Sequence, residues 1–294
     1  MSKLIVSGRE KFLNRILNAD PGRVLNSPET LSGKIQTGNP LDQEIKKALN
    51  QIKSESISAD GRMVDYKKLA ESSNYRDYRE LAGQLRTFDF RTLQTPSEQL
   101  GFWINLYNAL VIDAVIQAKV QGSVTESWLG VMGFFQKAAY QIGNERFSLT
   151  DIEHGVLRAN RGFPHFPGPH FSPDDPRIAS VFEEIDPRIH FALNCASNSC
   201  PPIGVYSPEQ IDNQLNLAAQ NFINGDTTVD PERREISISK IFLWYKADFG
   251  GSAGIRKMLS EYLEPAGNKE PGSNILSKYR LKYHPYDWGL NKLS

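Results

Sequence analysis

A chain of 294 residues with 34 basic and 34 acidic side chains has a formal net charge of zero at pH 7. It lacks the basic surface that nucleic acid requires and the clustered Lys and Arg that hold proteins on anionic membranes, so we expect neither partner. The length suits one large domain or two small ones, and two cysteines are too few for a disulfide scaffold.

The first twenty residues contain no apolar stretch of signal-peptide length, and nowhere do 18 apolar residues follow one another. We therefore expect a soluble, cytoplasmic protein whose two cysteines are thiols rather than a disulfide. Residues 1–40 mix Ser, Gly, Asn and Pro with scattered apolar residues, which is typical of a partly flexible N-terminal arm. We expect residues 41–294 to form a single domain.

Helical periodicity begins near residue 40. Apolar residues at three- and four-residue intervals predict a helix over residues 40–54, and residues 66–71 and 78–87 continue in the same manner. Residues 98–120 form the longest apolar segment, but polar residues interrupt it, so it predicts a buried central helix rather than a membrane span.

Two asparagines, Asn105 and Asn108, lie on this apolar helix. Each amide needs hydrogen-bond partners, because burying one unpaired costs about 1–3 kcal/mol. Either both bind neighbouring backbone, or one of them binds substrate or orients a catalytic group. Trp103, Trp244 and Trp288 are candidates for a pocket wall, with core packing as the alternative.

A hairpin is predicted at residues 138–149, about the turn at Gly143-Asn144-Glu145. The next residues, Thr150 to Glu153, fit a capping box, so a helix should begin at Asp151 and carry His154 in its first turn. Residues 160–178 are rich in Pro, Gly, Phe and His, which predicts an ordered loop or lid.

The alternation of apolar residues over 186–195 predicts a half-buried strand that ends near Cys195 and leaves its sulfur at an edge or rim. A turn-like run and the pair Pro201-Pro202 follow it. His190 has the opposite strand parity from Cys195, so its side chain should face away from that sulfur.

The C-terminal part predicts a helix over 208–224, two strands within 227–244 about a charged turn, a helix over 255–263 and a last strand over 279–283. This order predicts an α+β fold, with a helical N-terminal half packed on a mainly antiparallel sheet. A cysteine-protease-like architecture is one candidate.

Cys195 and His154 are the candidate nucleophile and general base. A cysteine attacks carbon as the thiolate, and an imidazole or a helix N-terminus nearby lowers its pKa. Glu153 or Glu98 would orient the base. Two alternatives remain: Cys195 is a packed thiol, and Glu153 caps its helix. Cys200 either resolves an oxidised Cys195 or has no role.

No cofactor and no metal are expected. The C-x4-C spacing lacks the paired pattern of zinc motifs, although His165 and His170 keep a weak site open. The Gly-rich residues 250–254 lack the Lys-Ser/Thr of a P-loop and the spacing of a dinucleotide fingerprint, so they predict a hinge or turn.

Five segments in order resemble the DUF547 domain, a family named for its unknown function. They are EQLGFWINLYNAL (98–110), SLTDIEHGVLR (148–158), DPRIHFALNCASNSCPPI (186–203), WYKADF (244–249) and YDWGLN (286–291), and they cover about residues 95–291. The resemblance implies that Cys200 and His190 are dispensable. It implies a cysteine-hydrolase-like arrangement of Glu, His and Cys. The residues that match the family pattern are Glu98, Trp103, Asn105, Asn108, Glu153, His154 and Cys195.

Three functions remain open. The first is a cysteine-dependent hydrolase or acyl transferase for an amide, peptide or thioester bond, with Asn105 or Asn108 stabilising the oxyanion. The second is a non-catalytic module that binds a peptide or small ligand in the same cleft, with Trp103 and His190 as further contacts. The third is a redox sensor using Cys195 and Cys200. The partner is a small molecule or peptide, and the oligomeric state is open.

Overall fold

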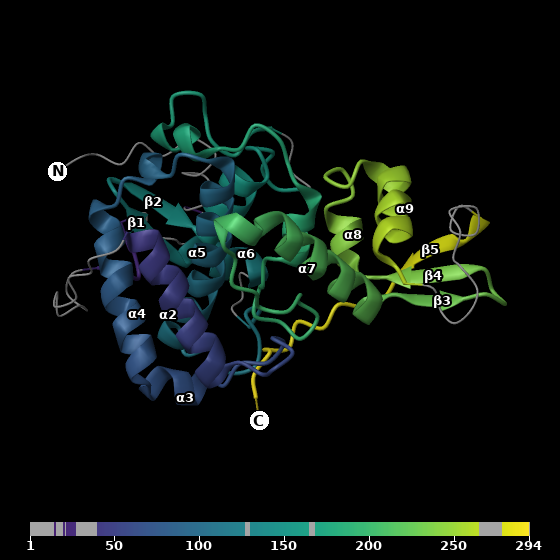
Figure 1. Ribbon diagram of the computed structural model, residues 1–294, viewed down its shortest axis with the longest axis horizontal. Helices are drawn as coiled ribbons and strands as arrows, with labels where there is room; N and C mark the ends of the chain where they lie inside the picture. Colours follow the sequence, from purple (N-terminus) through teal and green to yellow (C-terminus); the bar gives the residue numbers. More distant parts are fainter. Residues whose placement is uncertain are drawn as a thin grey trace.

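The N-terminal half is a group of helices around α5 (Pro96–Gln117), as the periodicity predicts. In the computed structural model, residues 15, 20, 22–27, 40–126, 130–164, 168–264 and 278–293 are described. Three helices, α2 (Leu41–Ser56), α3 (Tyr66–Glu71) and α4 (Ser73–Gln84), precede α5. Both α2 and α3 contact α5, and α4 packs along α2 (Figure 1).

Helix α5 begins at a capping box, in which the Thr95 hydroxyl accepts from the Glu98 backbone N–H and the Glu98 carboxylate accepts from the Thr95 N–H. Pro96 occupies the first turn, where its missing N–H costs nothing. Of the described helices, α5 alone is long and apolar enough to cross a membrane. Because 83% of that apolar window is buried inside the protein, α5 is its core helix.

Short 3-10 helices connect the larger elements. They are η2 (Leu85–Thr87), η3 (Phe90–Thr92), η5 (Pro176–Ser180), η6 (Pro187–Phe191) and η7 (Pro208–Gln210). The predicted strand over 186–195 is wrong, because its first half is η6. Asp186 caps η6 by accepting from the Arg188 backbone N–H, and Pro187 fixes the first φ. This Asp-Pro start signal outweighs the alternating pattern.

The predicted hairpin at 138–149 is confirmed. After α6 (Gly130–Lys137), β1 (Ala139–Ile142) pairs antiparallel with β2 (Glu145–Ser148). A seven-residue π-helix, η4 (Asp151–Leu157), follows directly and is entirely buried.

The C-terminal part contains a second, mixed sheet. Here β3 (Thr228–Asp230) pairs antiparallel with β4 (Glu235–Ile238), and β4 pairs parallel with β5 (Arg280–Tyr283). Two separate small sheets therefore replace the expected single one, within the α+β class that the sequence predicts. Three helices lie next to the second sheet and share a hydrophobic cluster with β4: α7 (Ile211–Asp226), α8 (Lys240–Trp244) and α9 (Gly251–Tyr262). The residues of α8 were predicted to be strand.

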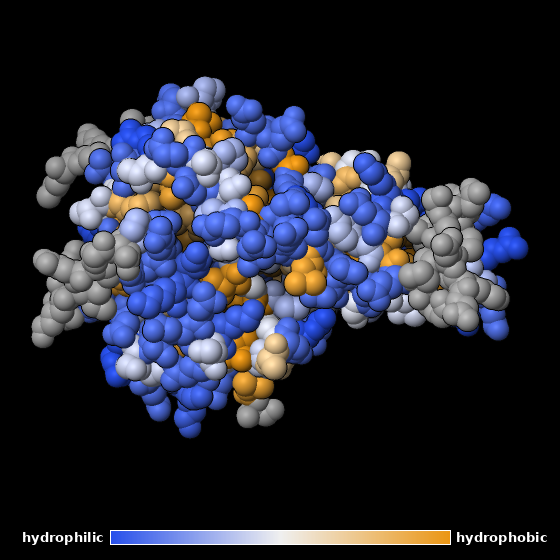
Figure 2. All heavy atoms as spheres, in the orientation of Figure 1, coloured by the Kyte–Doolittle hydropathy of each residue, from blue (hydrophilic) through white to orange (hydrophobic). Residues whose placement is uncertain are grey.

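Two hydrophobic clusters form the interior. The larger surrounds α5, and the smaller joins α7, α8, α9 and β4. Helix η6 links them, because Ile189 belongs to the first cluster and Phe191 to the second. In Figure 1 the helices α2 and α4 lie at one end of the molecule and β3–β5 at the other. Figure 2 shows that mainly hydrophilic side chains cover this face, with small apolar areas between them.

Both ends of the chain return to the large cluster. Near the start, the Leu25 N–H donates to the Ala139 carbonyl, and Asn26 bonds the backbone of Ala82 and Gln141. Most of the predicted N-terminal arm lies outside the described residues.

Near the end, residues 289, 290 and 292 form β-bridges with Ser123, Ser197 and Val64 respectively. Residues 286–293 therefore cross three segments that are distant in the sequence.

Candidate functional site

A pocket of about 120 Å³ lies where the two hydrophobic clusters meet. Its walls come from α5, η4, η6, the segment after η6, α8 and the segment 286–288. Both cysteines line it, together with Glu153, His154 and His190. The fold therefore brings the predicted nucleophile, base and one candidate carboxylate to a single cavity.

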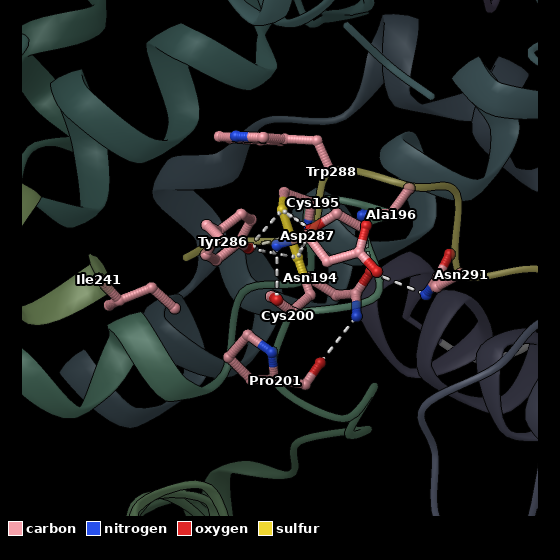
Figure 3. Close-up of a disulfide and its surroundings, with 12 residues drawn as sticks. Asn194, Cys195, Ala196, Cys200, Pro201, Ile241, Tyr286, Asp287, Trp288 and Asn291 are labelled. Carbon is pink, nitrogen blue, oxygen red and sulfur yellow. Dashed lines mark hydrogen bonds between the residues drawn. A yellow bond between two sulfur atoms is a disulfide. The ribbon is translucent and has the colours of Figure 1, made fainter. Parts of the chain in front are cut away.

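The two cysteines form a disulfide, Cys195–Cys200, with Cα atoms 6.1 Å apart (Figure 3). The prediction of two thiols is wrong for this structure. The reason is local: Ala196 has a φ of 62°, in the left-handed region, and the turn it starts brings position 200 back beside position 195. Such a conformation at a non-glycine residue cannot be recognised from an Ala-Ser-Asn-Ser run.

Hydroxyl groups surround the disulfide. The Ser197 Oγ and the Tyr286 OH each lie 3.2 Å from the Cys195 Sγ, and the Tyr286 OH lies 3.3 Å from the Cys200 Sγ. Burial raises the pKa of Tyr286, so this phenol keeps its proton at neutral pH. Trp288 lies beside Tyr286, with ring centroids 4.7 Å apart (Figure 3). Both sulfurs thus have hydrogen-bond donors at hand.

The π-helix η4 carries the next two groups and begins differently from its prediction. Thr150 makes no capping hydrogen bond; instead Ser148 and Asp151 cap each other, the Ser148 N–H donating to Asp151 Oδ2 and the Asp151 N–H to Ser148 Oγ. His170 binds Asp151 Oδ1 at 2.7 Å, and Arg177 lies 3.4 Å from its Oδ2. The capping box is therefore two residues earlier than predicted, and its acidic member is buried and paired.

Glu153 points its carboxylate at two phenols. Oε2 accepts from the Tyr107 OH at 2.9 Å and Oε1 accepts from the Tyr245 OH. Burial opposes the charge, but the neighbouring basic side chains, of which Arg158 carries a permanent charge, and the Tyr245 hydrogen bond outweigh it, so the pKa of Glu153 lies below its usual value. The carboxylate is therefore ionised at neutral pH, and it does not cap η4.

His154 bonds Arg158 rather than Glu153. Its Nδ1 lies 2.9 Å from Arg158 Nη1 and 3.9 Å from Glu153 Oε1. Burial lowers the pKa of His154 to about 3, so the ring is neutral. Because a guanidinium can only donate, Nδ1 is the acceptor and the proton of the neutral ring is on Nε2. His154 is thus fixed as a hydrogen-bond donor through Nε2.

His190 has the same Nε2–H tautomer as His154 but leaves the other nitrogen free of partners among the described residues. Its Nε2 lies 3.0 Å from Asp248 Oδ2, and that carboxylate also receives Arg158 Nε at 2.5 Å. Its ring stacks on Tyr245 with centroids 4.0 Å apart. Burial lowers the pKa of His190, while hydrogen bonds from His190 and Arg158 outweigh burial and keep the pKa of Asp248 below its usual value. A neutral ring that donates from Nε2 has its lone pair on Nδ1.

The prediction that His190 faces away from Cys195 is wrong, because both residues line the same pocket. Strand parity does not apply to η6, in which successive side chains do not alternate between two faces.

The asparagines of α5 bind backbone. Asn105 donates to the Tyr206 carbonyl at 2.7 Å and accepts from the Tyr206 N–H at 2.8 Å. Asn108 donates to the Ala192 carbonyl at 3.0 Å and accepts from the Asn194 N–H at 2.9 Å. Neither lines the pocket. They fasten the segment that carries the cysteines to the core helix.

Glu98 and Trp103 also lie away from the pocket lining. Glu98 belongs to the capping box of α5. Trp103 is buried against Phe102 and Phe147, with ring centroids 5.2 and 5.0 Å apart, whereas Trp244 and Trp288 line the pocket.

Four residues that build the site were not among the predicted site residues. Tyr107, Tyr245, Asp248 and Tyr286 supply phenols and a carboxylate to the groups described above. Three of them lie in the segments WYKADF and YDWGLN, whose likeness to a family pattern was the available signal.

Among the described residues, no group of three or more His, Cys, Asp and Glu side chains is arranged to hold a metal ion. His165 lies outside the described residues, and His170 is paired with Asp151.

Comparison with known proteins gives one family. Residues 90–223 match the model described as "Protein of unknown function, DUF547". No curated protein and no solved structure matches the chain. The matched range contains both cysteines, Glu153, His154 and His190, whereas the segments with Tyr245, Asp248 and Tyr286 lie beyond it.

Proposed function

Residues 90–223 match the DUF547 family, and from the groups in the pocket we propose that the protein is a cysteine-dependent hydrolase or acyl transferase acting on an amide, peptide or thioester bond. One observation carries the proposal. A single cavity holds Cys195 with two neutral imidazoles, one fixed as an acceptor and the other as a donor. Acyl transfer needs a base for the nucleophile and a donor for the oxyanion.

His190 is the general base in this proposal, in place of His154. Its Nδ1 has a lone pair and no hydrogen-bond partner among the described residues, and Asp248 orients the ring through Nε2. This is the nucleophile, base and carboxylate relation of a catalytic triad. His154 cannot accept a proton at Nδ1 while Arg158 donates to it, so it serves as the oxyanion donor through Nε2–H.

In the reaction, the Cys195 thiol gives its proton to His190 Nδ1 and its sulfur attacks the acyl carbon. The tetrahedral oxyanion accepts a hydrogen bond from His154 Nε2. When the carbon–nitrogen or carbon–sulfur bond breaks, imidazolium His190 returns the proton to the leaving group. Water or another acceptor then attacks the thioester with the same base, releasing the acyl product and the free thiol.

The disulfide sets a condition on this chemistry. Cys195 is a nucleophile only after the bond to Cys200 is reduced, which takes two electrons and two protons from a thiol reductant. We therefore expect turnover only in the presence of such a reductant.

The test is a screen of reduced protein with chromogenic amides and thioesters. Cys195→Ala should abolish release of the leaving group with the fold intact by circular dichroism. Cys200→Ala is the matched control, because it removes the partner sulfur, and it should retain activity without needing reductant. Undiminished turnover in Cys195→Ala would refute the proposed nucleophile.

A non-catalytic module that binds a peptide or small ligand is the second candidate. The observation favouring it is that both sulfurs are bonded to each other, so neither is a nucleophile in this state. Inert Cys195 after reduction of the folded protein would favour this role.

A further inference from the structure

Glu153 is a buried carboxylate that makes no ion pair with a Lys or Arg among the described residues, and Arg158 acts on it only from beyond ion-pair distance. Among the described residues, the one basic group within ion-pair distance is His154, 3.9 Å away, and that ring is neutral. Arg158 directs its guanidinium to Asp248, His154 and the Gly162 carbonyl. Two phenols stabilise the carboxylate by hydrogen bonds but do not neutralise it. Buried charges in proteins are ordinarily paired, so this one has capacity for a counter-ion.

The cavity next to this carboxylate has aromatic walls and no basic residue. Its lining in the described part of the chain includes no Lys or Arg. Trp244, Trp288 and Tyr286 form one wall, with ring centroids between 4.7 and 5.5 Å apart. Tyr107 and Tyr245, the donors to Glu153, also line it. Aromatic faces carry negative potential and attract organic cations.

We propose that this pocket binds an organic ammonium group, with Glu153 as its counter-ion and the Trp244–Tyr286–Trp288 wall against its methyl or methylene groups. The step from ligand to substrate rests on the proposed function: if the protein is a hydrolase, its substrate is an acyl compound that carries an amine. The binding itself requires no reaction.

The volume fits this class of ligand. A cavity of about 150 Å³ holds a benzene molecule, so the roughly 120 Å³ available here accommodates a trialkylammonium head or a short aminoalkyl chain. An anionic group is disfavoured, because it would meet the ionised carboxylate at close range in a low-dielectric cavity.

The experiment compares two probes of the same shape. Choline and its uncharged carbon isostere 3,3-dimethylbutan-1-ol are titrated by calorimetry into the full-length Cys195→Ala protein, which removes the reaction and the disulfide together. We expect choline to bind about tenfold more tightly, in keeping with an ion pair supported by cation–π contact. In a Glu153→Gln background this preference should disappear. Glu98→Gln, at a capping carboxylate outside the pocket lining, is the matched control and should keep it.

Each outcome decides the proposal. Equal affinity for the two probes, no binding of either, or a preference that survives Glu153→Gln would overturn it. If Glu153→Gln does not fold, Trp288→Leu replaces it: this change keeps apolar bulk but removes the π face, and it should reduce choline affinity more than isostere affinity. This titration measures binding and not turnover. A protein that prefers choline but has no hydrolase activity would therefore count against the proposed function alone.

Discussion

The two pocket histidines are hydrogen-bonded through different ring nitrogens, His154 through Nδ1 and His190 through Nε2, so we predict different effects on Cys195. In reduced Cys200→Ala protein, we expect Cys195 to react with iodoacetamide with a pH midpoint below the free-thiol value of about 8.5. His190→Ala should abolish this lowering, because it removes the acceptor Nδ1. His154→Ala should leave it in place. The measurement is the alkylation rate against pH, and the reverse ranking of the two variants would exchange their roles.

Replacing Asn108 distinguishes a structural role of this residue from a catalytic one. Asn108→Ala leaves the Ala192 carbonyl and the Asn194 N–H without their side-chain partner in the interior. We expect the free energy of unfolding to fall by about 2–3 kcal/mol, measured by urea denaturation. A variant of native stability with strongly reduced turnover would instead place Asn108 in the reaction.

At the scale of elements, the π-helix η4 owes its position to a glycine. A Cβ atom at Gly155 would overlap Cε2 and Cζ of the buried Phe171 ring. Gly155→Ala should therefore destabilise the protein by about 1–3 kcal/mol and shift Glu153 and His154 out of register with their partners.

The control is Gly101→Ala on α5, where the nearest atom to the new Cβ is 3.7 Å away. Alanine is the better helix former, so this change should be neutral or stabilise by up to about 1 kcal/mol. Thermal unfolding of both variants checks the pair, and equal melting temperatures would contradict the close packing of η4.

Elements with long, regular periodicity were predictable, and those whose start is set by a local signal were not. Helices α2, α5 and α7 and the β1–β2 hairpin follow from apolar spacing and a turn. The failed strand at 186–195 is a 3-10 helix begun by Asp186-Pro187. Its side chains alternate in hydrophobicity because η6 lies between two hydrophobic clusters.

The same distinction applies to the site. Cys195, His154 and Glu153 were recognisable by residue chemistry, and all three line the pocket. Tyr245 and Tyr286 reach it from segments about 90 residues away from their partners, through tertiary packing that spacing does not encode. The pairing of His190 with Asp248 depends equally on packing, across a separation of 58 residues.

For the whole molecule, the buried neutral histidines predict sensitivity to acid. The pKa of His154 is lowered to about 3 in the folded protein, whereas an imidazole in the unfolded chain has a pKa of about 6.5. Between these two pH values the unfolded chain binds a proton that the folded protein does not bind. Stability is thus fully present above about pH 6.5 and declines toward pH 3, by about 1.4 kcal/mol per pH unit for this group. His190 acts in the same direction. Below pH 4, Asp151 and Asp248 add to the loss, since their pKa values are also lowered.

Urea denaturation at several pH values measures this slope. His154→Gln should flatten it between about pH 6 and pH 4. His284, whose pKa is raised, contributes in the opposite direction and is common to both proteins. An unchanged slope in the variant would mean that His154 is protonated in the folded state.

The crossing of residues 286–293 over three distant segments has a consequence for biosynthesis. Tyr286 and Trp288 close one wall of the pocket, and the bridge of Leu290 to Ser197 fastens that wall beside the cysteines. During translation, α5, η4 and both cysteines leave the ribosome long before this wall exists. A nascent chain can therefore fold its helical half early, while the pocket is completed only after residue 290 has emerged.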